Sequence, residues 1–407
     1  MIVERVQAGS VLQQAYGAAR ELARRGVTEG ARVAVDTADS AAVLTWLLGA
    51  DLLGAATLVV EPSWAPRERE AVFEDARPDV VVTGGAEPTG ERIAPAGDEG
   101  TLFYLPTTSG SSGRPKVLAR TRGSWSRSFA ALGRFPEPGP VFIPGPLSSS
   151  LFLFGALHAV WGGQEPRLSS RFTPEEACDG VTAVHLVPAM LAKLLAVLER
   201  RPDLRESCAL RTVVCGGAHV GEELRARFSL LLPHAELVEY YGSAEHSLIA
   251  IRRGEDGLRV VPGVETDIRD GVLWVRSPLS FSGYLRGGVR DPAPEWSTVD
   301  DLARFTGAGA LEVLGRAGTM VSSGGKLVPA EEVEAVLRGV PGVVDVLVTG
   351  TPHATLGAVV TAVVEGTPLL RELRAAARAG LEPGKRPRRW VITDALPRTA
   401  SGKVRRS

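Results

Sequence analysis

The feature that most constrains the fold of this chain is an alternation of short apolar runs with longer amphipathic segments. Apolar runs at residues 32–35, 56–60 and 79–83 are typical of buried strands, and residues 13–25 and 65–76 carry apolar side chains at helical spacing. Further strand-like runs follow at residues 101–105, 141–144, 182–187, 211–215 and 235–239. Strands that alternate with helices form sheets whose faces the helices cover. The sequence therefore predicts a large α/β domain with mixed, mostly parallel sheets flanked by helices.

The periodicity changes after about Arg252, where strand-like segments follow one another closely. Residues 271–276 alternate apolar and polar side chains, and glycines mark the turns between such segments. This pattern predicts a small β-rich subdomain. Residues 136–146 and 283–294 are rich in proline and glycine, and we expect both to be extended loops.

A separate unit is predicted from Gly315 onward. It contains a glycine loop, a helix at residues 329–338, a strand at residues 343–349 and a basic tail. Its size is that of a small domain. We expect a large N-terminal domain at residues 1–315 and a small α+β C-terminal domain at residues 316–407.

Composition excludes several classes of protein. The chain has 407 residues with a formal net charge of −1, and its interspersed charges create no field that would gather nucleic acid or an anionic membrane. Its three cysteines show neither CxxC spacing nor a histidine cluster typical of zinc sites. The N-terminus is charged where a signal peptide would be apolar, and no apolar run approaches about 18 residues, so we expect neither a signal peptide nor a membrane span. We therefore expect a cytoplasmic protein.

The segment Thr107–Lys116 reads TTSGSSGRPK and directly follows a strand-like run. Glycines between small hydroxyl residues allow backbone N–H groups and hydroxyls to surround phosphate oxygens, and the lysine adds positive charge. The Gly-x-x-x-x-Gly-Lys-Ser/Thr pattern of a P-loop is absent. The sequence predicts a phosphate-binding loop, with a flexible surface linker as the alternative.

Four further clusters carry candidate chemistry: residues 239–245, 298–302, 315–326 and 397–403. In the first, an aromatic ring could lie on a base and a carboxylate could hold Mg²⁺. In the second and third, an aspartate and an arginine could reach a ribose or a phosphate. In the last, a lysine on a glycine turn could approach a reacting phosphate. Each cluster alone is equally compatible with an ordinary strand end or a solvated turn.

In this order, the clusters resemble the AMP-forming acyl-CoA synthetase and adenylation-domain superfamily, which includes luciferase, and look most like short bacterial acyl-CoA ligases. The resemblance spans nearly the whole chain. It implies the adenylate-forming enzyme fold and the ATP-dependent activation of a carboxylic acid to acyl-AMP with release of pyrophosphate. It further implies ATP and Mg²⁺ as cofactors, and thioester formation with CoA or with the phosphopantetheine of a carrier protein.

The resemblance assigns roles residue by residue. The contacts of the phosphate loop are Thr108, Ser109, Gly110, Ser111, Ser112, Gly113 and Lys116. The residues beside the adenine and the acyl group are Gly216, Gly217, Ala218, Tyr241, Gly242, Ser243 and Ala244. Glu245 matches the magnesium ligand, Asp301 the ribose-binding aspartate and Arg316 the arginine of the hinge. Lys403 matches the lysine that contacts the acyl carboxylate and the α-phosphate. After rotation of the small domain, the thiol-site loop of Gly324, Gly325 and Lys326 meets the pantetheine arm.

Several positions depart from the family pattern. Ala244 stands where a threonine usually lies beside the α-phosphate, and Asp300 replaces the glycine before the ribose-binding aspartate. Arg122 stands where a histidine often follows the phosphate loop. Gly318 and Thr319 replace aspartates at the hinge, which predicts a looser hinge because glycine has no φ restriction.

The acid that this chain activates is predicted from residues 146–155. Amino-acid-activating members place an aspartate in this region, whereas this chain has serines at 148–150. An ammonium without a carboxylate partner is costly to bury, which argues against an α-amino acid. The apolar run at 151–155 would provide an apolar wall, so we expect an aliphatic or aromatic acid.

Two alternatives stay open. The acyl acceptor is CoA or a carrier protein, and the sequence hardly separates these. A degenerate homologue that binds ligand without turnover is the other alternative, suggested by Ala244 and the hinge changes. Retention of Lys403, Glu245 and Asp301 favours an active enzyme.

Overall fold

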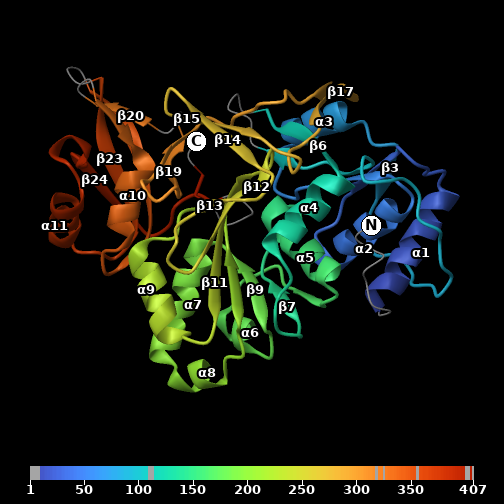
Figure 1. Cartoon of the computed structure of the whole chain (residues 1–407), viewed down its shortest axis with the longest axis horizontal. Helices are drawn as coiled ribbons and strands as arrows, with labels where there is room; N and C mark the ends of the chain where they lie inside the picture. Colours follow the sequence, from blue (N-terminus) through green and yellow to red (C-terminus); the bar gives the residue numbers. More distant parts are fainter. Residues whose placement is uncertain are drawn as a thin grey trace.

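The computed structural model describes residues 10–108, 114–316, 320–323, 326–353, 357–398 and 404–405. These residues form four β-sheets and their covering helices, and Figure 1 shows the C-terminal unit, in orange and red, at one end of the molecule. Within these ranges, no helix combines the length and the apolar character needed to cross a bilayer.

The first sheet has the strand order β17-β16-β6-β4-β2-β1-β3, with β5 paired to β6. Its strands are β1 (Arg32–Val35), β2 (Ala56–Val59), β3 (Val80–Val82), β4 (Leu102–Tyr104), β5 (Thr107–Thr108), β6 (Lys116–Thr121), β16 (Gly283–Arg286) and β17 (Val289–Pro292). Its helices are α1 (Ser10–Arg24), α2 (Ser40–Leu52) and α3 (Pro66–Ala76). Strands β1 to β4 run parallel, whereas β6, β16 and β17 are antiparallel additions.

The second sheet has the order β13-β12-β11-β10-β9-β7-β8. Its strands are β7 (Val141–Ile143), β8 (Pro166–Leu168), β9 (Ala183–Leu186), β10 (Thr212–Cys215), β11 (Glu236–Ser243), β12 (Ser247–Arg253) and β13 (Arg259–Val260). Its helices are α4 (Arg122–Leu132), α5 (Ser150–Gly162), α6 (Pro174–Cys178), α7 (Pro188–Arg200), α8 (Pro202–Ser207) and α9 (Glu222–Leu231). Both β9 and β10 are buried along their whole length, as expected for parallel strands covered on two faces.

The two sheets share one large apolar core. Side chains of α2, α4 and α5 pack in this core against strands of both sheets, so these helices form a central layer. Helix α3 covers the opposite face of the first sheet, and α7 and α9 cover the outer face of the second. The α/β architecture predicted from the alternating sequence pattern is therefore confirmed.

The predicted β-rich subdomain is the antiparallel sheet of β14 (Glu265–Arg269), β15 (Val272–Arg276), β18 (Asp301–Phe305) and β19 (Leu311–Arg316). The prediction of an extended loop at 283–294 is wrong, because β16 and β17 form a hairpin there. Gly287 and Gly288 make its turn, with φ values of 54° and 85°. The predicted loop at 136–146 likewise contains β7.

The C-terminal unit has its own apolar core between one sheet and two helices. Its elements are β20 (Met320–Ser323), β21 (Lys326–Pro329), α10 (Ala330–Arg338), β22 (Val343–His353), β23 (Gly357–Gly366), α11 (Leu370–Gly380) and β24 (Arg389–Thr393). The predicted helix at 329–338 is confirmed, and the predicted strand at 343–349 extends to His353. The domain division at residues 315 and 316 stays a prediction, and Gly318 lies outside the described residues.

Candidate active site

The ends of the predicted phosphate loop are held together as a hairpin. Strand β5 pairs antiparallel with β6, and Thr108 lies opposite Lys116. The side chain of Lys116 is exposed, and its Nζ lies 5.3 Å from the centroid of the Tyr284 ring. An ammonium at this distance from an aromatic face is attracted by the ring. The lysine predicted to contact phosphate is thus directed by a residue that sequence reasoning missed.

The turn that carries Glu245 connects β11 to β12 and is fixed through its backbone. Arg120, on β6, donates hydrogen bonds to the carbonyls of Ala244 at 2.6 Å, Glu245 at 3.2 Å and Leu279. The amide of Phe281 donates to the Glu245 carbonyl at 2.6 Å. Groups from two distant segments, β6 and the loop at 279–281, therefore fix the backbone of the turn that carries Glu245.

Arg120 is a buried cation, with 1% of its surface exposed. Burial lowers the pKa of its guanidinium to about 9, and the nearby Glu245 carboxylate opposes that shift. A guanidinium stays charged in proteins at neutral pH. Arg120 therefore supplies fixed positive charge beneath the Glu245 turn, and no motif in the sequence marked it.

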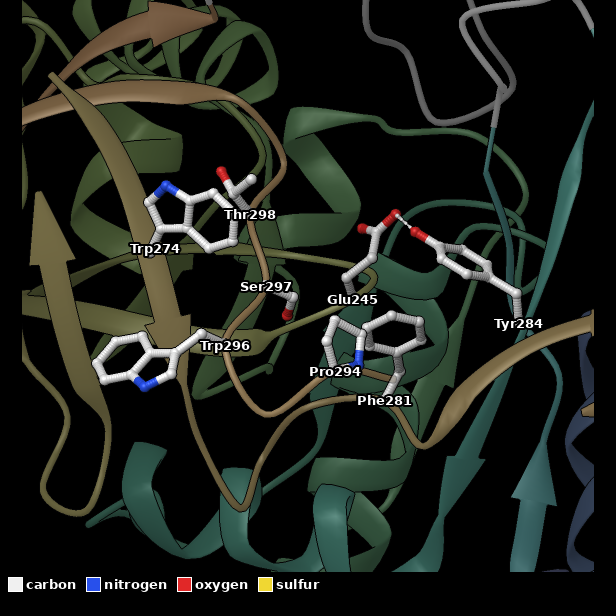
Figure 2. A pocket seen from close by; sticks show the side chains of 8 residues that line it. All are labelled: Glu245, Trp274, Phe281, Tyr284, Pro294, Trp296, Ser297 and Thr298. Atoms are coloured by element: carbon white, nitrogen blue, oxygen red, sulfur yellow. Dashed lines mark hydrogen bonds between the residues drawn. The ribbon is translucent and has the colours of Figure 1, made fainter. Parts of the chain in front are cut away.

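The Glu245 carboxylate and Tyr284 lie side by side in the wall of a pocket of about 240 Å³ (Figure 2). The Tyr284 hydroxyl donates to Glu245 Oε1 at 3.3 Å. Burial, followed by the Glu245 charge, raises the pKa of Tyr284, so the phenol stays a hydrogen-bond donor. The other lining residues are Trp274, Phe281, Pro294, Trp296, Ser297 and Thr298.

His246 follows Glu245 and is structural. Its Nε2 lies 2.9 Å from Ser297 Oγ, and its backbone amide donates to Ser243 Oγ at 3.1 Å. Burial lowers the pKa of His246 to about 4, so the ring is neutral at pH 7. Ser243, predicted as a nucleotide contact, thus caps the turn in this structure.

Two predicted nucleotide contacts from distant segments meet. The hydroxyl of Tyr241, on β11, donates to Asp301 Oδ2 at 2.5 Å. Asp301 begins β18, and the antiparallel register places it opposite Arg316 on β19. Asp300, which stands in place of a glycine, has a φ of 61°, in the left-handed region that glycine adopts without strain.

The glycines at the strand ends are required by close contacts. A Cβ on Gly216 would lie 2.3 Å from Cζ of Tyr240, and one on Gly242 would lie 1.7 Å from the Ser247 carbonyl oxygen. Gly217 has a φ of 85°, and Ala218 after it is exposed. The Gly216–Ala218 turn therefore follows β10 closely beside β11, which carries Tyr241.

Several predicted residues cannot be placed. Outside the described residues lie Ser109, Gly110, Ser111, Ser112, Gly113, Gly324, Gly325 and Lys403. The side chains of Arg316 and Lys326 are likewise not described, although their backbones belong to β19 and β21.

The segment that leads to Lys403 is nevertheless anchored at both sides. Arg398 and Val404 form an antiparallel bridge, and the amide of Arg405 donates to the Pro397 carbonyl at 2.7 Å. The Arg398 guanidinium lies 3.0 Å from Asp345 and 2.6 Å from Glu365. Arg398 and Val404, which flank the segment with Lys403, are therefore paired with each other, and Arg398 is fixed to β22 and β23.

Arg122, which stands where the family often has a histidine, is buried in a structural ion pair. Its Nε lies 2.6 Å from Asp51 Oδ1, and its Nη1 donates to the Ala96 carbonyl at 2.6 Å. These contacts join the start of α4 to α2.

The Glu245 carboxylate fits a magnesium site in which the phosphates of a nucleotide supply most of the other ligands. Among the described residues, no group of three or more His, Cys, Asp or Glu side chains could hold a metal ion. Mg²⁺ in ATP-dependent sites usually takes one or two protein carboxylates, with phosphates and water as its other ligands. Glu245, with its second oxygen unbonded among the described residues, matches this donor set.

Comparison with known proteins agrees with this geometry. A family model described as AMP-binding enzyme matches residues 5–95 and 85–285, and one described as AMP-binding enzyme C-terminal domain matches residues 332–403. The chain is 30% identical over 429 residues to the uncharacterized acyl-CoA ligase YhfT of Bacillus subtilis, covering 92% of this chain and 87% of YhfT.

Two further similarities differ in what they cover. Phosphinothricin tripeptide synthetase PhsB of Streptomyces viridochromogenes is 30% identical across 95% of this chain, but the match covers 38% of PhsB. The crystal structure of ATP-bound MatB from Rhodopseudomonas palustris superposes with a TM-score of 0.84 at 23% identity, covering 97% of this chain and 91% of MatB. The MatB likeness supports the same fold.

Proposed function

Because the chain belongs to the AMP-binding enzyme family, we propose that it is an acid–thiol ligase that uses ATP to join a carboxylic acid to CoA. The observation that carries this proposal is the contact between Tyr241 and Asp301, two predicted nucleotide contacts from distant segments. Their hydrogen bond is 2.5 Å long, and Glu245 lies in the turn that follows β11, the strand that carries Tyr241. The similarity to YhfT supports the same reaction.

The nucleotide lies along this edge in the proposed complex. The Tyr241 ring stacks on the adenine beside the Gly216–Ala218 turn, and the Asp301 carboxylate accepts the ribose hydroxyls. The triphosphate reaches toward Glu245 and the hairpin of Thr108 and Lys116. Glu245 holds Mg²⁺, which supplies positive charge that neutralises the phosphates.

In the first step, a carboxylate oxygen of the acid attacks the α-phosphorus, and pyrophosphate leaves. Both partners are anions, so the chain must place positive charge around the phosphorus. Lys116 serves the phosphates that leave, and Lys403 serves the acyl carboxylate and the α-phosphate. No side-chain nucleophile takes part, and the product is acyl-AMP.

In the second step, the CoA thiol attacks the acyl carbonyl and AMP leaves. We propose that the small domain rotates about Arg316 between the steps. This rotation withdraws Lys403 and brings Gly324, Gly325 and Lys326 to the pantetheine arm.

The acid in this proposal is aliphatic or aromatic and lacks an α-amino group. Phe152 and Phe154 on α5 are buried just after the serines. The serine hydroxyls are already bonded, Ser148 to Glu61 at 2.7 Å and Ser150 to Tyr104 at 3.1 Å. The first turn of α5 therefore offers apolar side chains and no carboxylate of its own.

ATP–pyrophosphate exchange across a panel of carboxylic acids tests adenylation. We expect exchange with one class of acid, and its loss in Lys403→Ala. If no acid supports exchange in the wild-type protein, the chain is a non-catalytic homologue.

The similarity to PhsB supports a second candidate, transfer of the acyl group to a carrier-protein phosphopantetheine. Thioester formation measured with CoA and with a phosphopantetheinylated carrier protein separates the two. We expect the higher kcat/KM with CoA, and the reverse ranking would assign the carrier protein as acceptor.

A further inference from the structure

One face of the first sheet points three polar side chains toward the Glu245 turn. Strand β16 pairs antiparallel with β6, and Tyr284 lies opposite Leu118. Because side chains alternate along a strand, Lys116 and Arg120 share the face of Leu118, and Tyr284 projects from the same side. The opposite face, with Val117, packs into the apolar core under α3.

Tyr284 is the member of this set that touches both charged ends of the site. Its hydroxyl donates to Glu245 Oε1 at 3.3 Å, and its ring lies 5.3 Å from the Lys116 ammonium. Figure 2 shows the Tyr284 hydroxyl directed at the Glu245 carboxylate, with the hydrogen bond between them on one side of the pocket. Among the described residues, Glu245 Oε2 has no bonding partner, so it is the oxygen available to a cation.

We propose that Tyr284 is a positioning residue of the metal–polyphosphate site, holding Glu245 through its hydroxyl and Lys116 through its ring. The hydroxyl restricts the rotation of the carboxylate and leaves Oε2 toward the pocket. The ring keeps the lysine over β16 near the start of the phosphate loop. This inference rests on the proposed function, because it assumes that MgATP occupies this pocket.

The two contacts of Tyr284 can be removed separately. Tyr284→Phe deletes the bond to Glu245 and keeps the aromatic face under Lys116. Tyr284→Leu deletes both. Loss of a group that orients a metal ligand commonly weakens metal affinity by about 10-fold to 100-fold, and the long 3.3 Å bond places this case at the lower end.

The experiment measures ATP dissociation constants of the full chain by calorimetry, once with saturating Mn²⁺ and once with EDTA, without any acid. The ratio of the two constants reports how strongly metal and nucleotide assist each other on the protein. For Tyr284→Phe we expect metal-free binding as in wild type and a metal-dependent gain roughly 10-fold smaller. For Tyr284→Leu we expect metal-free ATP binding to weaken as well, since Lys116 loses its support.

Tyr16→Phe is the matched control, because it also removes a tyrosine hydroxyl, but on α1 and outside this pocket. Circular dichroism and urea unfolding verify that each variant is folded. A Tyr284→Phe protein with the wild-type ratio, or an equal loss in Tyr16→Phe, would overturn the inference. If the wild-type protein binds no ATP and catalyses no ATP–pyrophosphate exchange, the proposed function itself is contradicted. That outcome is distinct from a failure of the Tyr284 inference, which depends only on how the variants compare with wild type.

Discussion

Two arginines lie close in the chain or in space to predicted active-site residues, and they are held by opposite chemistry. Arg120 holds the Glu245 turn through the carbonyls of Ala244 and Glu245 and also donates to the Leu279 carbonyl, and none of these hydrogen bonds goes to a carboxylate. Arg398, which precedes the segment with Lys403, pairs with the carboxylates of Asp345 and Glu365. Arg120 is almost fully buried, whereas the Arg398 side chain is 28% exposed.

The difference shows how charge is used in the two regions. Backbone carbonyls carry no net charge that would neutralise Arg120, so its field reaches the nearby Glu245 carboxylate. The carboxylates of Asp345 and Glu365 neutralise the charge of Arg398. We therefore expect Arg398 to act by positioning the backbone next to the Lys403 segment. An interaction with carbonyls also cannot be removed by acid, whereas one with carboxylates can.

Removing Arg120 is expected to have the largest effect. In Arg120→Met, the carbonyls of Ala244 and Glu245 lose their donor, and each unsatisfied buried carbonyl costs about 1–3 kcal/mol. Displacement of the turn by about 1 Å is expected to lower ATP–pyrophosphate exchange about 100-fold. Arg304→Met, which removes an exposed ion pair with Glu312, serves as the control. Exchange within twofold of wild type in Arg120→Met would contradict this role.

Arg398→Gln tests the geometric role of the second arginine. We expect ATP–pyrophosphate exchange to fall on the order of 10-fold, because the segment with Lys403 loses the anchor that Arg398 provides on β22 and β23. Thioester formation from supplied acyl-adenylate should be unchanged, since Lys403 acts in the first step. Arg338→Gln is the control, because Arg338 also pairs with Asp345, at 2.9 Å, but lies on α10. Equal loss of exchange in both variants would show that only the Asp345 charge balance matters.

The sequence predicted the alternating strands and helices and the candidate site residues that lie in motifs. It did not predict the residues outside the motifs that contact them. Alternating apolar runs locate strands because period and burial are local properties of a sequence. Glu245, Tyr241 and Asp301 were predicted as site residues because the order of their motifs resembles a known family, and their roles stay predictions. Arg120 carried no such signal, since a charged residue inside a strand is normally expected to be exposed.

Tyr284 was missed because its strand was missed. The glycines at 287 and 288 and the prolines nearby indicated a loop, whereas the glycines form the tight turn of a hairpin. The hairpin joins β6, which lies more than 150 residues earlier in the chain. Pairing over such a separation is specified by tertiary packing, which local patterns do not report.

Lowering the pH is expected to destabilise the region around the Glu245 turn more than the region around Arg398, and this effect should be smaller than those of the arginine substitutions. Burial lowers the pKa of His158 and His246 to about 4 and that of His185 well below its usual value. The unfolded chain therefore binds more protons below pH 6.5, and the large domain should lose stability as pH falls from 6.5 toward 4. Burial alone would raise the pKa of Asp345, but Arg338 and Arg398 lower it, so its contribution is lost only below about pH 3.8.

Hydrogen exchange resolved by peptide, labelled at pH 7.5 and at pH 5, measures this difference after correction for intrinsic rates. We expect protection to fall in α5, β9 and the Glu245 turn, with β22 and β23 retaining theirs. Equal loss in both regions would contradict the assignment of acid sensitivity to the buried histidines.

The smallest expected effect concerns the strained residue beside Asp301. Asp300 has a φ of 61°, and Asp300→Gly relieves this strain, although glycine also increases the entropy of the unfolded chain. We expect a gain of about 0.5–1 kcal/mol in the free energy of unfolding, measured by urea denaturation. Asp270→Gly is the matched control, because Asp270 has a φ of 52° at the turn between β14 and β15. Both variants should be stabilised alike with an unchanged KM for ATP; a higher KM in Asp300→Gly alone would show that the strained backbone helps to aim Asp301 at the nucleotide.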